Sequence, residues 1–289
     1  MTLSILIPTY DYDARRLVED LQTLALREGV EAEILVGDDG SPSGSPWLTA
    51  VEDLPAVRVL RYADNVGRAA HRNRMAEEAQ GQWLLFTDCD AQVPPAFSLR
   101  RYLEATRHAA VVCGGLCNPS GEPARGYELR WRYEEAARPR FTPKRLNNQE
   151  RVPFRTFSFL IRRDVFRAVR FDETIRSYGY EDVLFGIQLE RAGHRPYYID
   201  NPLINGDIEP SAVYLAKSEE ALRTLKELQG RMDGRCPVEK AACRLQRWHL
   251  AGAVRLFYRM FRRPMRRNLL GPHPNLTLFS LYKLGYFLT

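Results

Sequence analysis

The sequence of 289 residues predicts an α/β protein with a doubly wound, mostly parallel sheet, helices on both faces of the sheet and a basic helical C-terminal extension. Three observations lead to this prediction. Strand and helix patterns alternate four times within about the first 90 residues. The strand at 82–87 is apolar at nearly every position, which is typical of a strand buried on both faces. Polar residues follow three of the strands, and right-handed crossovers bring such strand ends to one edge of the sheet.

The first half of the chain is expected to contain four strands with helices between them. Residues 3–8 form a β-rich run that stops at Pro8, because proline cannot donate to a sheet ladder. Leucines at helical spacing then predict a helix over 13–28. The elements expected after it are strand 33–37, strand 57–60, a helix that ends at about residue 79 and strand 82–87.

The second half shows a less regular pattern. Residues 139–153 are rich in Pro, Asn and Arg, which predicts a loop. The other elements expected there are strand 111–115, helix 126–138, strand 156–161, helix 163–169, a helix that begins at about residue 181, a last strand at 196–199 and a helix over 211–229.

Composition divides the chain into a domain and an extension. The net charge of +6 arises in residues 231–289, which hold twelve Lys or Arg and two acidic residues. We expect one domain over residues 1–230, with halves at about 1–110 and 111–230, and the extension over 231–289. Five cysteines without a C-x-x-C pair indicate a reducing, cytoplasmic compartment. No apolar run reaches the roughly 20 residues that a membrane-spanning helix needs.

The extension carries an amphipathic pattern. From Arg244 onward, arginines and apolar residues fall on separate helical stripes, with a helix break expected at Pro264. A basic amphipathic helix with Trp and Phe is typical of interfacial membrane binding, so we expect residues 244–288 to contact an anionic membrane surface. The alternative is a helix packed on the α/β domain with solvated arginines. No nucleic-acid-binding module is present, so nucleic acid is not an expected partner.

Two carboxylates, Asp88 and Asp90, directly follow strand 82–87. In an extended chain, residues i and i+2 point the same way, so both carboxylates can face one divalent cation, and oxygen ligands suit Mg²⁺ or Mn²⁺. The alternative is an ordinary acidic turn. The pair Asp38-Asp39 has a simple Asp-Gly turn as its alternative, and Glu181-Asp182 has helix N-terminal charges.

Five short motifs follow one another along the chain: Ile7-Pro8-Thr9-Tyr10, Gly37-Asp38-Asp39-Gly40-Ser41, Asn65-Val66-Gly67 with Arg72-Asn73, Asp88-Cys89-Asp90, and Gly179-Tyr180-Glu181-Asp182. In this order they resemble glycosyltransferase family 2 over roughly residues 3–230. The resemblance implies an inverting enzyme of the GT-A fold.

The resemblance also implies a role for each matched residue. Asp39 would hold the base of a nucleoside-diphosphate sugar, most often uracil in this family. Asp90, with Asp88, would bind the Mn²⁺ or Mg²⁺ that bridges the two phosphates. Asp182 would be the catalytic base and Glu181 would bind acceptor hydroxyls. The implied donor-binding residues are Pro8, Thr9, Tyr10, Asp38, Asp39, Asn65, Arg72, Asp88 and Cys89, and the implied acceptor-binding residues are Tyr178, Gly179, Tyr180 and Glu181.

The sequence departs from the family pattern at one position. Many relatives carry a histidine ligand where this chain has Asn205, which offers a metal only its amide oxygen. Whether Asn205 or Asp207 takes over that role stays open. The expected acceptor is a glycan or a lipid-linked glycan, handled at the inner face of the plasma membrane.

Two other functions compete with sugar transfer. A nucleotidyltransferase that makes nucleotide-sugars also binds nucleotides at such an edge, but it usually has a Gly-rich, basic loop where this chain has Pro8-Thr9-Tyr10-Asp11. A non-catalytic, membrane-bound scaffold of the same fold is the second alternative. The intact carboxylates at 88, 90 and 182 argue against it.

Overall fold

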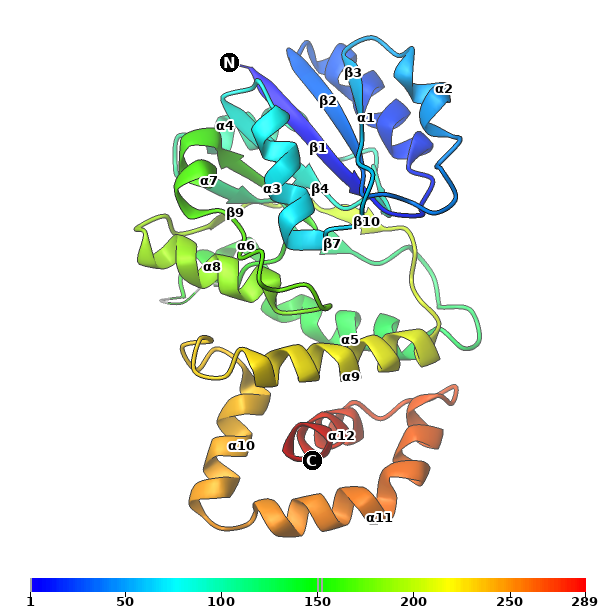
Figure 1. Cartoon of the computed structure of the whole chain (residues 1–289), viewed down its shortest axis with the longest axis vertical. Coiled ribbons are helices and arrows are strands. Elements are labelled where there is room, and N and C mark those ends of the chain that lie inside the picture. The colour runs from blue at the N-terminus through cyan, green and yellow to red at the C-terminus, as the bar shows by residue number, and fades with distance from the viewer. Residues whose placement is uncertain (1, 150, 152) are drawn as a thin grey trace. The chain divides into compact units, whose positions relative to one another are not determined.

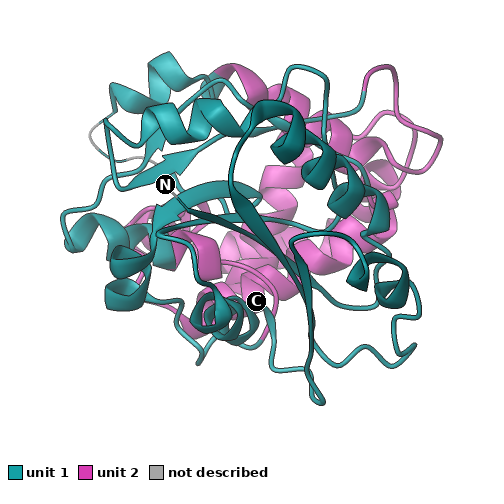
Figure 2. Ribbon diagram, turned by 90° about the horizontal axis from the view of Figure 1, so that it is seen from above, with its two compact units in different colours: residues 1–119, 140–176, 185–207 teal, residues 120–139, 177–184, 208–289 magenta. Residues whose placement is uncertain are grey.

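The computed structural model describes residues 2–149, 151 and 153–289 and divides the chain into two compact units (Figures 1 and 2). Unit 1 holds the residues up to 119 together with 140–176 and 185–207. Unit 2 holds 120–139, 177–184 and 208–289. The chain therefore passes between the units several times. A boundary between domains at residue 230 stays a prediction.

Unit 1 is built on a seven-stranded, mostly parallel sheet, which confirms the predicted fold class. One strand, β8, runs antiparallel to both of its neighbours, while the other neighbouring strands pair in parallel. The strands lie in the order β3 (Val57–Arg61), β2 (Ala32–Asp38), β1 (Leu3–Thr9), β4 (Trp83–Thr87), β8 (Ser158–Arg162), β6 (Val111–Cys113) and β9 (Tyr197–Tyr198).

Helices cover both faces of this sheet (Figure 1). Alternate residues of a strand point to opposite faces, so Ile5 and Ile7 join one core cluster and Leu6 joins the other. Burial on both sides explains why β4 is apolar along its length. One cluster includes α1 (Arg15–Glu28), α2 (Leu48–Glu52) and α4 (Leu99–Ala105), and the other includes α3 (Arg68–Glu78), α6 (Pro143–Asn147), α7 (Arg163–Val169) and, from residue 185, α8 (Glu181–Arg191).

A cluster of phenylalanines packs under the end of β4. Phe86 stacks on Phe159 with ring centroids 4.8 Å apart, and Phe171 stacks on Phe185 at 4.0 Å. Offset-stacked rings add about 0.5–1.5 kcal/mol per pair beyond their burial. The cluster therefore holds the backbone of β4 in place two residues before Asp88.

A second, three-stranded sheet follows the end of β4. Its central strand β10 (Leu203–Asn205) pairs antiparallel with β5 (Ala91–Gln92) and parallel with β7 (Leu116–Cys117). The predicted last strand at 196–199 is shorter in the structure, as β9, and β10 comes after it. Three residues are too few to show a periodicity, so only pairing across the fold makes β10 a strand.

Unit 2 consists of helices, and its core surrounds α12. Figure 1 shows α12 beside α9, α10 and α11, and these three helices contact it. Phe279 and Tyr282 are buried there, so the expected helical extension is present. The helices of unit 2 are α5 (Glu128–Ala137), α9 (Ser211–Glu227), α10 (Pro237–Arg247), α11 (Ala251–Leu269) and α12 (Leu276–Leu288).

Two local predictions are wrong. Helix α11 continues through Pro264, because Tyr258 before the proline and Met265 and Leu269 after it belong to one core cluster with α12, which holds both halves in line. The predicted loop at 139–153 contains α6, whose buried Leu146 packs in the core of unit 1, and the 3-10 turn η1 (Arg138–Arg140) overlaps its start. Residues 150 and 152 of that loop lie outside the described residues.

No helix in the described part of the chain combines the length and the apolar content needed to cross a membrane.

Candidate active site

One group of candidate residues lies in unit 1, at one edge of the large sheet. Strand β1 pairs in parallel with both β2 and β4, so the C-terminal ends of these three strands lie at the same edge. This juxtaposition brings together Thr9, Asp38 and the segment that begins at Asp88, so these strand ends meet at one edge as the sequence predicts. Ligands of open α/β sheets bind at this edge.

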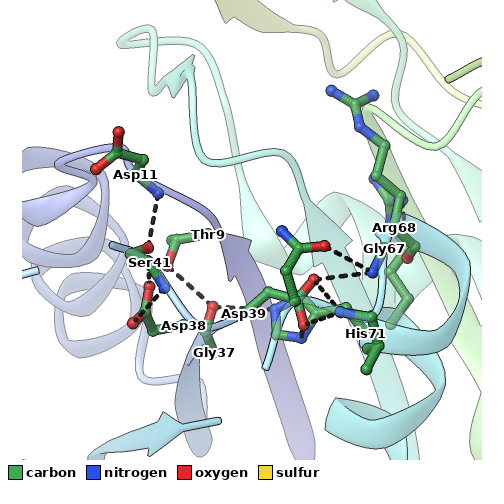
Figure 3. Close-up of polar contacts among 12 residues, drawn as sticks. Thr9, Asp11, Gly37, Asp38, Asp39, Ser41, Gly67, Arg68 and His71 are labelled. Atoms are coloured by element: carbon green, nitrogen blue, oxygen red, sulfur yellow. Dashed lines mark hydrogen bonds and ion pairs between the residues drawn. The ribbon is translucent and has the colours of Figure 1, made fainter. Parts of the chain in front are cut away.

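Asp38 joins the loops that follow β1 and β2 (Figure 3). Its carboxylate accepts hydrogen bonds from the hydroxyls of Ser41 and Ser45, the latter at 3.1 Å. The Ser41 hydroxyl oxygen in turn accepts the backbone N–H of Asp11 at 2.7 Å. Because Asp38 is buried, its carboxylate holds the loops beside the site and is not itself exposed to a ligand.

Asp39 holds the loop between β3 and α3. Its carboxylate accepts the backbone N–H groups of Val66 at 3.2 Å and Gly67 at 3.1 Å (Figure 3). The side chain of Asn65 also accepts the Gly67 N–H, at 3.0 Å. Asp39 is only 3% exposed, so little of its carboxylate is accessible to a ligand.

His71 is a buried partner of Asp39 that the sequence did not reveal. Its ring is buried, with Nε2 3.0 Å from the Gly37 carbonyl oxygen and Nδ1 3.5 Å from Asp39. A carbonyl only accepts, so Nε2 carries a proton. Burial lowers the pKa of His71, and the charge of Asp39 opposes that shift. In the sequence, this contact is reflected only in the glycine at position 37, because a Cβ there would lie 2.9 Å from the His71 ring.

The loop after β1 turns one predicted donor residue inward and the next outward. The hydroxyl of Thr9 donates to the Gly37 carbonyl at 2.9 Å and is buried, whereas Tyr10 is 49% exposed. Beside this loop lies a pocket of about 410 Å³, open at the ends of β1 and β2. Its lining includes Asp11, Tyr12, Ser43 and Trp47. Aromatic rings next to carboxylates suit a ligand with both flat and hydroxyl-bearing parts.

Asp88 is paired with a buried arginine. Nη2 of Arg72 lies 2.7 Å from Oδ1 of Asp88, and the guanidinium stacks over the Phe171 ring at 5.7 Å. Arg72 is buried while the side chain of Asp88 is 26% exposed. One positive charge therefore already balances Asp88.

Asp90 lies close to the segment that follows β10. The register of β10 places Asn205 opposite Ala91, and the N–H of Gly206 donates to the Asp90 carbonyl at 2.9 Å. Burial raises the pKa of Tyr12 to about 12, and the carboxylates of Asp207 and Asp90 add to that shift. Both carboxylates therefore act on the pKa of the same phenol.

These residues fit a hard divalent cation that is shared with a ligand. Asp90 and Asp207 supply carboxylate oxygens, which suit Mg²⁺ or Mn²⁺. Within the described residues, no group of three or more His, Cys, Asp or Glu side chains could hold an ion on its own. Burial raises the pKa of the Cys89 thiol to about 12, so that thiol stays protonated. An ion bound here would need further ligands from a bound substrate or from water.

Asn73, next to Arg72, joins α3 to the segment after α7. Its amide donates to the Phe171 carbonyl and accepts the Phe171 N–H, at 2.9 and 3.0 Å, and it is buried. Replacing Asn73 by alanine should lower the free energy of unfolding by about 3 kcal/mol, because buried polar groups lose their partners. Urea denaturation measures this. The exposed Gln80→Ala is the matched control, and a loss below about 1 kcal/mol would contradict the assignment.

A second group of candidate residues lies in unit 2, at the start of α8. Asp182 and Glu181 occupy the first turn of the helix, and Oδ1 of Asp182 accepts the N–H of Val183 at 2.7 Å. Gly179 and Tyr180, just before them, both have left-handed backbones, with φ of 101° and 68°. A Cβ on Gly179 would lie 2.6 Å from Cβ of Ala221. A left-handed non-glycine residue is strained, and such strain concentrates at functional sites.

Asp182 lies in a group of buried side chains. Its charge contributes to the raised pKa values of Tyr180 and Cys236, although burial is the main cause for both. For Cys236 the pKa is about 12, and Glu239 raises it further than Asp182 does. Glu181 is itself buried, so little of its side chain reaches the surface.

Tyr178 is held by α9. Its N–H donates to Glu220 at 3.1 Å, and its carbonyl accepts the Thr224 hydroxyl at 2.9 Å. The ammonium of Lys217 lies 5.4 Å from the centre of its ring, within the range of a cation–π contact. These contacts fix the turn that leads to Asp182.

A partly buried charge network, which the sequence did not reveal, supports this turn. Lys217 pairs with Glu209, and Arg130 lies 3.4 Å from Glu209 and 3.1 Å from Glu134. Burial alone would lower the pKa of Arg130, but the two glutamates raise it. The spacing of Arg130 and Glu134, four residues apart on a helix, was the only sequence signal.

Comparisons with known proteins agree on one family. Residues 4–170 match the family model described as Glycosyl transferase family 2. The succinoglycan biosynthesis protein ExoO of Rhizobium meliloti (strain 1021) is 34% identical over 91 residues, which are 32% of this chain and 26% of that protein. The uncharacterized glycosyltransferase YibD of Escherichia coli (strain K12) is 36% identical over 97 residues, 32% of this chain and 27% of that protein. The alignments thus span about a quarter of these relatives.

Solved structures share the fold over almost the whole chain. The mannosyltransferase PcManGT from Pyrobaculum calidifontis, in complex with GDP-Man and Mn²⁺, matches with a TM-score of 0.57 at 16% identity, over 99% of this chain and 84% of that chain. TarS from S. aureus matches with a TM-score of 0.55 at 16% identity, over 98% of this chain and 54% of that chain. At such identity the likeness concerns the fold.

Proposed function

The chain belongs to glycosyl transferase family 2, and from that premise we propose that it transfers a sugar from a nucleoside-diphosphate sugar to an acceptor hydroxyl with inversion at the anomeric carbon. The observation that carries the proposal is the shared edge of β1, β2 and β4. There Asp88 is paired with Arg72, and the N–H of Gly206, the residue before Asp207, donates to the Asp90 carbonyl. That edge combines an aromatic pocket with oxygen ligands for a cation.

The donor nucleoside binds at the ends of β1 and β2. Tyr10 offers an exposed ring for the base, with uracil favoured, and Pro8 and Thr9 shape the loop beneath it. Asp38 and Asp39 act mainly by holding the loops at residues 41–45 and 65–67. Cys89, whose thiol stays neutral, also supports the shape of the donor site.

The diphosphate lies at the end of β4. Asp90 would hold a Mn²⁺ or Mg²⁺ ion with Asp88 beside it, and Asp207 is better suited than Asn205 to replace the missing histidine, because it carries a charge. The ion would neutralise the charge that develops on the leaving nucleoside diphosphate. The structure of PcManGT with GDP-Man and Mn²⁺ supports a metal of this class for the fold.

Asp182 is the proposed catalytic base. Inversion requires one base on the side opposite the leaving group, which takes the proton of the acceptor hydroxyl as that oxygen attacks. The acceptor is bound by the turn at 178–180, where Tyr178 and Tyr180 offer rings to a sugar, and by Glu181. The strained backbone of this turn supports the proposal.

The acceptor is a glycan or a lipid-linked glycan in polysaccharide synthesis. The relative named for succinoglycan biosynthesis supports this class. Residues 244–288 bring the protein to an anionic membrane surface, so the enzyme works as a peripheral protein at the inner face of the plasma membrane.

A donor-cleavage assay tests the proposed reaction. Purified protein is incubated with UDP-, GDP- and dTDP-sugars, with and without Mn²⁺, and the released nucleoside diphosphate is measured. We expect metal-dependent release, fastest with a UDP-sugar. Pyrophosphate release from a nucleoside triphosphate and a sugar phosphate would instead identify a nucleotidyltransferase, and no cleavage of any donor would favour a scaffold.

A further inference from the structure

Helix α11 has three sectors instead of the two that its sequence suggests. Tyr258, Met265 and Leu269 are buried in the core of unit 2. A second sector, which we call the apolar sector, is exposed and carries Ala253, Leu256, Phe257, Met260, Phe261 and Pro264. A third sector is basic and includes Arg255, Arg259, Arg262 and Arg263, all exposed.

The apolar sector is exposed although it is as hydrophobic as a core. Leu256 is 61% exposed and Met260 65%, and Trp248, just before the helix, is 64% exposed. The spacing of three and four residues within the sector places its members on one side of the helix. Soluble surfaces rarely gather so many large apolar side chains, and such patches mark interaction sites.

The charge around this sector identifies its partner. Residues 241–289 contain nine Lys or Arg and no Asp or Glu. A second copy of the chain docked on the same face would bring arginines against arginines, which is unfavourable. An anionic lipid surface offers both an apolar layer for Leu256, Phe257 and Met260 and phosphate charges for the arginines.

We propose that the exposed face of α11, its apolar sector together with the flanking arginines, is the surface that docks onto anionic lipid. This inference rests on the proposed function, and it narrows the expected contact at residues 244–288 to one helix. Helix α12, although the most apolar segment of the extension, is excluded, because Phe279, Tyr282 and Phe287 are buried within unit 2.

Vesicle sedimentation tests the proposal with the full-length protein. Vesicles of phosphatidylcholine alone are compared with vesicles that contain an equal share of phosphatidylglycerol, at low salt and at high salt. We expect binding at least tenfold tighter to the anionic vesicles, and weaker binding at high salt because the phosphate attraction is screened. Equal binding to both kinds of vesicle, or to neither, would overturn the proposal.

Two sets of substitutions separate the sectors. The triple variant Leu256→Gln, Phe257→Gln and Met260→Gln should lose at least tenfold in binding, and Arg255→Gln with Arg259→Gln and Arg263→Gln should lose about a hundredfold. All six side chains are exposed, so thermal unfolding should not change. The matched control is Leu26→Gln on α1, also a highly exposed leucine, which should bind like the parent protein.

Two further readouts distinguish the other outcomes. Donor cleavage in solution should be the same in both triple variants, so a failed vesicle test leaves the proposed reaction intact and a failed cleavage assay leaves docking intact. Sedimentation velocity reports the oligomeric state. If the parent protein is a dimer and the apolar triple variant is a monomer, the face binds a second copy of the chain, and the proposal of lipid docking is overturned.

Discussion

Replacing Asp182 by asparagine is expected to lower kcat for sugar transfer about 10³-fold, while donor binding stays within roughly twofold of the parent protein. The amide has the same shape and can still accept the N–H of Val183, so the start of α8 keeps its structure. What the amide cannot do is take a proton from the attacking hydroxyl. Steady-state kinetics with saturating acceptor measures kcat, and calorimetry with the nucleoside diphosphate and Mn²⁺ measures donor binding.

The control for this prediction is Glu227→Gln, which removes a carboxylate from the exposed end of α9 in the same unit. It should leave kcat unchanged. If Asp182→Asn abolished donor binding as well, Asp182 would belong to the donor site and its role as a base would be wrong. Full activity of the variant would assign the proton transfer to another group.

Replacing Asp90 by asparagine should lower turnover about 10²-fold or more at a fixed, low Mn²⁺ concentration, because the charge that develops on the leaving diphosphate loses its stabilisation. Part of the activity should return as Mn²⁺ is raised, since an amide oxygen is a weaker ligand than a carboxylate. A Mn²⁺ titration of initial rates would measure the loss of turnover and its recovery. The donor-dependent enhancement of water proton relaxation by Mn²⁺ would measure binding of the metal.

The same change at an exposed carboxylate of unit 1, Asp53→Asn, should shift neither the rate nor the Mn²⁺ dependence. A second comparison uses Asp88→Asn. Because Arg72 already balances Asp88, this variant should affect the Mn²⁺ dependence less than Asp90→Asn does. Equal Mn²⁺ dependence of Asp90→Asn and the parent protein would remove Asp90 from the metal site.

The order of elements in the first half was predictable because it depends on local patterns. The apolar run of β4, the leucine spacing of α1 and the polar strand ends each require only neighbouring residues, and the structure has the expected elements there. The short strand β10 and helix α6 were not predictable in this way. Strand β10 forms because it pairs with β5, which is more than a hundred residues earlier in the chain. Helix α6 forms because Leu146 is buried in the core of unit 1 among residues that are distant in sequence.

The candidate site divides in the same way. The sequence by itself determined which residue types gather at the strand ends, because topology requires parallel strands to end at one edge. Only the tertiary structure decided what each carboxylate contacts. It paired Asp88 with Arg72, placed His71 against Asp39 and joined Gly206, the residue before Asp207, to the carbonyl of Asp90. The extension follows the same rule: spacing predicted an amphipathic α11, but only packing against α12 decided which of its apolar residues are buried and which face outward.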